Sequence, residues 1–104
     1  MNIETVGARS LKDKRRVIRS FRDRVQSKLR LSVAEVGAHD DHQRAVMALA
    51  AVAREKGRVE ELLAAAARMA GTLRDGVLAD RRTEFVPFGE QGQAMMPSPM
   101  QELP

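Results

Sequence analysis

Residues 44–53 read Arg-Ala-Val-Met-Ala-Leu-Ala-Ala-Val-Ala, and their conformation decides the fold of this chain. By intrinsic propensity this alanine-rich run favours a helix. As a strand it would be a buried central one, whose small side chains would let helices pack closely against it. Periodicity does not separate the two conformations for so short an apolar run. The segments on either side of it must therefore be considered.

Those flanking segments contain two clear helices. Residues 10–29 repeat apolar side chains at helical spacing, and Ser10 can cap the helix, with Asp13 three residues on as a short capping box. These apolar side chains form one stripe along the helix, which consists of Leu11, Ile18, Phe21, Val25 and Leu29. Lys14 projects from within this stripe, and we expect its stem to lie on the core while its ammonium reaches water. A second helix is predicted over residues 58–74.

Two more segments are typical of strands. Residues 31–36 alternate apolar and polar side chains, and residues 81–88 carry the apolar Phe85, Val86 and Phe88. Pro87 has no backbone donor, which places this last strand at a sheet edge or Pro87 at the end of the strand.

Two architectures are compatible with these elements. If residues 44–53 are helical, the chain forms a three-helix bundle. If they are extended, the order is βαββαβ, a ferredoxin-like α+β sandwich with two helices on one face of a four-stranded antiparallel sheet. We favour the sandwich, because the bundle leaves residues 31–36 and 81–88 without a role.

Length and composition bound the possible functions. The 104 residues suit one domain, expected over residues 1–88, followed by a disordered tail rich in Gly, Gln, Met and Pro over residues 89–104. The chain has no cysteine, which excludes disulfides, thiolate metal sites and thiol catalysis. No apolar run approaches the ~20 residues of a membrane span, and residues 1–20 are too charged for a signal peptide. We therefore expect a cytoplasmic protein.

The basic charge is concentrated in one segment. Residues 9–30 hold ten basic and two acidic residues, a net charge of +8, whereas the rest of the chain has a net charge of −4. At about 100° per residue, five of these cations gather on a helix face away from the apolar stripe. They are Lys12, Arg15, Arg16, Arg19 and Arg22. Such an asymmetry points to an anionic partner, although a well-solvated arginine-rich helix is the simpler interpretation.

Candidate catalytic and metal sites have little support. Residues 39–42 read His-Asp-Asp-His and could offer metal ligands, but a solvated turn is the better interpretation, because a loop does not fix their geometry. No nucleophile with a partner base is evident, and the glycines form no phosphate-binding loop. We therefore predict no enzymatic activity, no catalytic residue, no metal site and no cofactor.

Three stretches carry a resemblance to a known family. Ser-Leu-Lys-Asp-Lys-Arg at residues 10–15, Ser-Val-Ala-Glu-Val at 32–36 and Gln-Arg-Ala at 43–45 resemble signatures of the YlxP-like family of small bacterial proteins, a domain of unknown function. The similarity covers about residues 3–88. It implies the ferredoxin-like fold, an extended conformation for residues 44–53, and a small, often self-associating cytoplasmic protein. Genes of this family tend to lie among translation and ribosome-maturation genes, which implies an RNA or ribosome connection.

Three positions depart from the family pattern. His42 stands where the family has a Trp, and Gly37 stands where it has an acidic residue. The first strand has only residues 1–6 available to it, although the fold places that strand at the centre of the sheet. Either the true start of the protein lies upstream, or the sheet is incomplete at one end.

Two functions follow as hypotheses. The first is an accessory factor of ribosome maturation or translation, which binds the phosphate backbone of RNA through the basic helix face. Gln43 and Arg44 are candidates for additional polar contacts, although a structural connection is their simpler interpretation. RNA binding through the sheet needs aromatic platforms, which the middle strands lack. The second function is a homodimeric interaction module without RNA contact, paired through an open sheet edge.

Overall fold

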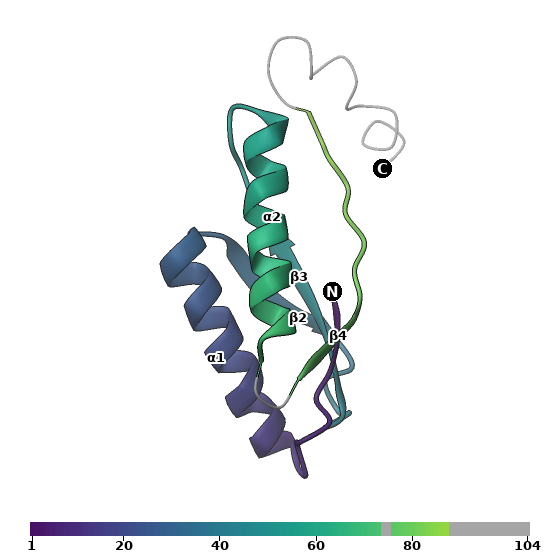
Figure 1. The fold of residues 1–104 in the computed structure, drawn as a ribbon. Helices are drawn as coiled ribbons and strands as arrows, with labels where there is room; N and C mark the ends of the chain where they lie inside the picture. The colour runs from purple at the N-terminus through teal and green to yellow at the C-terminus, as the bar shows by residue number, and fades with distance from the viewer. Residues whose placement is uncertain (74–75, 88–104) are drawn as a thin grey trace, which may run out of the picture.

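A computed structural model describes residues 1–73 and 76–87 of the chain (Figure 1). The elements follow the order β1 (Asn2–Glu4), α1 (Leu11–Leu29), β2 (Ser32–Gly37), β3 (Arg44–Ala50), α2 (Lys56–Gly71) and β4 (Val77–Asp80). The four strands of this described part form one antiparallel sheet in the order β2-β3-β1-β4, and both helices cover the same face of it. The predicted ferredoxin-like α+β arrangement is confirmed. The expected tail at residues 89–104 lies outside the described residues.

The ambiguous run at residues 44–53 is extended. β3 occupies Arg44–Ala50 and pairs with β2 on one side and β1 on the other. Its side chains alternate: Ala45 and Met47 are buried against the helices, whereas Ala48 is exposed on the other face. Strand pairing on both sides outweighs the helical propensity of the alanines, because propensity differences amount to only tenths of a kcal/mol per residue.

α1 starts where the sequence predicts. The Asp13 backbone N–H donates to the Ser10 hydroxyl at 3.1 Å, and the Asp13 carboxylate accepts from the Arg9 N–H at 3.1 Å. The helix ends at Leu29, and Arg30 follows in the left-handed conformation, with its N–H donating to the Gln26 carbonyl. The predicted Ser10 cap is thus confirmed, whereas the Asp13 carboxylate accepts from the N–H of Arg9 instead of the Ser10 N–H that a capping box uses.

The second helix and the last strand lie earlier in the chain than predicted. α2 begins at Lys56 instead of residue 58 and ends at Gly71. The last strand, predicted over residues 81–88, is instead β4 at Val77–Asp80, and residues 81–87 form no regular secondary structure. The reason is the length of the partner strand: Asp80 is already opposite Asn2, the first residue of β1, so β1 itself has no residue left for 81–87 to pair with, and only Met1 precedes it.

The short first strand is central, as expected. β1 has three residues, and each of them has a partner in β3 and in β4. One further pair extends this ladder, since Met1 and Met47 exchange two backbone hydrogen bonds of 2.8 Å each. Beyond Met47, β3 borders an open cavity of about 360 Å³, whose lining includes Leu49 and Leu63. The sheet is therefore narrower at this end.

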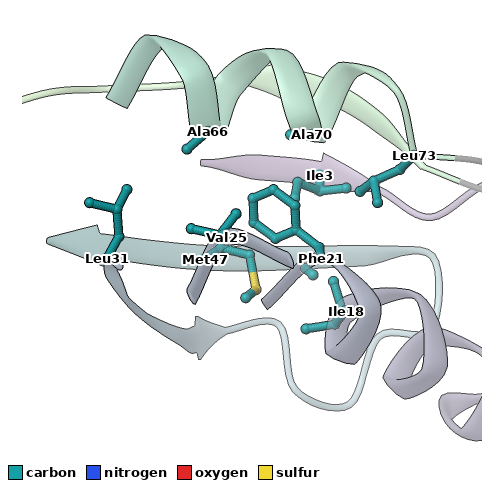
Figure 2. Packing of buried hydrophobic residues seen from close by; sticks show 10 residues of the cluster. Ile3, Ile18, Phe21, Val25, Leu31, Met47, Ala66, Ala70 and Leu73 are labelled. Atoms are coloured by element: carbon teal, nitrogen blue, oxygen red, sulfur yellow. The ribbon is translucent and has the colours of Figure 1, made fainter. Parts of the chain in front are cut away.

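The core lies between the sheet and the two helices (Figure 2). From α1 it contains Ile18, Phe21 and Val25, and from α2 it contains Ala66 and Ala70. The strands and loops contribute Ile3, Leu31, Ala45, Met47 and Leu73. Figure 2 labels all of these residues except Ala45 and shows the labelled side chains between the helices and the sheet. α1 fills the core with large side chains, whereas α2 approaches closely through alanines.

Candidate nucleic-acid interface

The exposed face of α1 carries the predicted basic cluster. Lys12, Arg15, Arg16 and Arg19 are all exposed, and they lie opposite the side of the helix that is buried in the core. They line a shallow depression of about 480 Å³ together with Ser20 and Asp23. We call this surface the basic face. Its members are spaced three and four residues apart, so they follow the helix axis over two turns.

The charges of this face are largely uncompensated. Within residues 1–73 and 76–87, none of the four cations forms an ion pair. Arg22, the fifth predicted residue, is different, because its Nε and Nη2 both donate to one carboxylate oxygen of Asp23 at 3.3 Å. Arg22 is also partly buried. The basic face thus presents four unpaired cations beside one cation that already has a partner.

Gln43 and Arg44 do not join this face. Gln43 is exposed in the loop before β3, where its N–H donates to the Asp41 carboxylate at 2.8 Å. Arg44 begins β3, and its neighbour Ala45 is fully buried against the helices. Successive side chains of a strand point to opposite faces, so the Arg44 side chain lies on the face of the sheet away from α1.

The prediction that the ammonium of Lys14 reaches water is wrong. The residue is 1% exposed, and its Nζ donates to the backbone carbonyls of Ala38 at 2.8 Å, His39 at 3.3 Å and Arg44 at 3.2 Å. It also forms an ion pair with Glu35 Oε2 at 3.0 Å. The loop between β2 and β3 offers carbonyls that a buried ammonium needs, and burial without them would be costly. Lys14 therefore joins α1 to this loop and takes no part in the basic face.

Glu35 is the residue that sequence reasoning missed. It lies on β2 at a helix-facing position, in step with Val33, and its carboxylate is half-buried beside Lys14. Its other oxygen lies 3.5 Å from Nδ1 of His39. A signal was present, because an inward-facing carboxylate on a strand and a lysine in an apolar helix stripe complement each other. Their pairing could not be read before the two elements were placed together.

The loop itself is a compact turn. Ala38 adopts a positive φ of 57°, and the Asp41 N–H donates to its carbonyl at 3.1 Å. The Thr5 hydroxyl donates to the carbonyl of His42 at 2.8 Å, which ties the loop to the end of β1. Within the described parts of the chain, no three His, Asp or Glu side chains are arranged to hold a metal ion.

The architecture defines a small α+β domain with a basic helix face on its outer surface. The chain belongs to the family described as protein of unknown function (DUF503), which matches residues 1–83. No curated protein and no solved structure matches it. In the described residues, neither helix is long and apolar enough to span a bilayer.

Proposed function

We propose that this protein is a non-enzymatic, RNA- or ribosome-associated accessory factor that binds the phosphate backbone through the basic face of α1. The observation that carries the proposal is the group of four exposed cations, Lys12, Arg15, Arg16 and Arg19, that have no ion-pair partner in the described chain. Arginine and lysine aligned along one helix can contact successive phosphates, and counterion release supplies the binding free energy.

Backbone contact explains the surface better than base recognition does. Of the aromatic side chains in the described residues, Phe21 is buried in the core and Phe85 lies beyond the end of β4. The sheet therefore lacks stacking platforms over the described strands, and single-stranded bases have nothing aromatic there to stack on. Contacts to phosphate position a complex without reading sequence. We expect moderate affinity, because Asp23 lies in the same depression as the cations.

The resemblance to YlxP-like proteins supports the same proposal. Genes for such proteins tend to lie among translation and ribosome-maturation genes, so ribosomal RNA or an assembly intermediate is the partner we expect. A cytoplasmic location follows from that partner. No cofactor and no metal enter the proposed function.

Titration of a labelled ribosomal RNA fragment at several salt concentrations tests the proposal. If about four phosphates are neutralised, the slope of log K against log salt should be about −3 to −4. The triple variant Arg15→Glu, Arg16→Glu, Arg19→Glu should abolish binding and leave the far-UV circular dichroism spectrum unchanged, because these side chains face water.

The matched control reverses two arginines elsewhere. Arg81 and Arg82 are exposed and line the cavity near Met1, which shares no residue with the depression on α1. Reversal of both should weaken binding far less than the triple variant does. If the triple variant binds RNA as tightly as the parent at low salt, the basic face only solubilises the protein and the proposal is wrong.

A further inference from the structure

The sheet face away from the helices is exposed and mostly apolar. Six small apolar side chains point to it from three strands: Ala34, Val36, Val46, Ala48, Ala50 and Val77. Val36 is 56% exposed and Val77 is 50% exposed, and both are among the exposed large apolar side chains of residues 1–73 and 76–87. Val52, 95% exposed, follows two residues after the end of β3. We call this surface the open face.

One pair of opposite charges stands within the open face. Glu4 on β1 and Arg44 on β3 are direct cross-strand partners, and both are exposed. Residues directly opposite in an antiparallel pair are neighbours, yet no ion pair joins Glu4 to Arg44 among those of the described chain. Near its centre the open face therefore carries one acid and one base at the same position along the strands, and each is available to a partner outside its own sheet.

We infer that the open face binds a second copy of this chain, sheet against sheet, around a two-fold axis. The axis would run between β1 and β3, parallel to the strands. A rotation about it places β3 of one copy over β1 of the other, so Arg44 of each copy comes over Glu4 of its mate. The same rotation brings β2, which carries Val36, over β4, which carries Val77. A two-fold interface requires a self-complementary surface, and this arrangement of charge provides one.

The area of the open face limits the affinity that we expect for the dimer. At about 3.3 Å per residue and about 4.8 Å between strands, the residues of the four strands give a footprint of roughly 300 Å². Standard interfaces bury ~800 Å² of accessible surface on each partner, so this contact is smaller than a standard one. We therefore expect a reversible dimer with a Kd on the order of tens of micromolar. Asp80, on the outermost strand, would lie at the rim, where water remains in contact with charged groups.

Such a dimer would leave both α1 helices on its outer surface. Each copy keeps its helices on the side away from the interface, so the two α1 helices lie on opposite outer surfaces of a four-layer assembly. The inference does not depend on the proposed function, because it rests on the other face of the sheet. If both hold, one dimer presents two basic faces that point in opposite directions.

Sedimentation equilibrium of the full chain, with two charge-reversed variants, tests the inference. In Arg44→Glu the centre of the open face, where β1 and β3 lie, carries only acids, and in Glu4→Arg the centre carries only bases. Each variant alone should dimerise about 10-fold more weakly than the parent or worse, because two like-charge contacts form per dimer. An equimolar mixture of the two should form a heterodimer at least as tight as the parent dimer, because each acid at the centre of the open face then lies over a base of the other copy.

The mixture separates this arrangement from the alternatives. Pairing through the free edge of β2 would not depend on Glu4 or Arg44, so both variants would self-associate like the parent, and the inference would be overturned. A parent that stays monomeric up to about 1 mM, far above the expected Kd, would overturn it as well. Arg68→Glu, an exposed position on α2, is the matched control and should dimerise like the parent.

Discussion

The two helices cover the same face of one sheet but are held there by different means. α1 buries three large apolar side chains and Lys14, while most of its remaining surface is charged. α2 buries only Ala66 and Ala70, and it has no side-chain cap at its start. The helix that carries the basic face is therefore also the more firmly anchored of the two. A charged face on α1 is tolerated because its other face holds the core and the loop before β3.

The largest effect should come from the anchor of α1. Lys14→Met leaves the Glu35 carboxylate half-buried without its cation and removes the donor to three backbone carbonyls. Loss of one member of a buried ion pair costs about 3–5 kcal/mol, so the free energy of unfolding in urea should fall by that much. Lys12→Met, an exposed neighbour, should change it by no more than ~0.5 kcal/mol. Equal effects of the two substitutions would show that Lys14 is no anchor.

A smaller effect is expected where α2 approaches the core. Ala66 is fully buried, so Ala66→Leu forces a larger side chain into a filled space. Overpacking of this kind costs about 1–3 kcal/mol, which thermal unfolding should detect as a lower midpoint. Arg68→Leu, two residues further along the same helix and exposed, should leave the midpoint nearly unchanged. If Ala66→Leu is as stable as the parent, α2 does not depend on close approach.

The smallest effect concerns the two helix starts. The Ser10 hydroxyl caps α1, so Ser10→Ala should cost about 1 kcal/mol in the free energy of unfolding. Glu55 holds the corresponding position of α2, but its side chain makes no capping hydrogen bond. Glu55→Ala should therefore cost much less. Chemical denaturation of both variants compares the two starts directly, and an equal loss would remove this difference between the helices.

Patterns within one short segment of the sequence were enough to predict α1 and the exposure of its basic face. The capping residue, the apolar stripe and the run of cations all lie within one continuous segment, and a helix converts their spacing into faces by a fixed rotation per residue. The start and end of α1 and the exposure of Lys12, Arg15, Arg16 and Arg19 therefore followed from the sequence. The role of these four residues in binding stays a prediction.

Three features could not be predicted from one segment alone, because each depends on contact with a segment distant in the chain. Whether residues 44–50 form a helix or a strand depends on β1 and β2, because their own propensities do not separate the two states. The last strand lies at Val77–Asp80 because β1 has partners for only those residues, whatever the apolar content of residues 81–87. Lys14 is buried because a loop 24 or more residues away supplies its acceptors. The helix and its charge depend on residues that are close in the chain, whereas the sheet and the burial of Lys14 require distant segments to pack together.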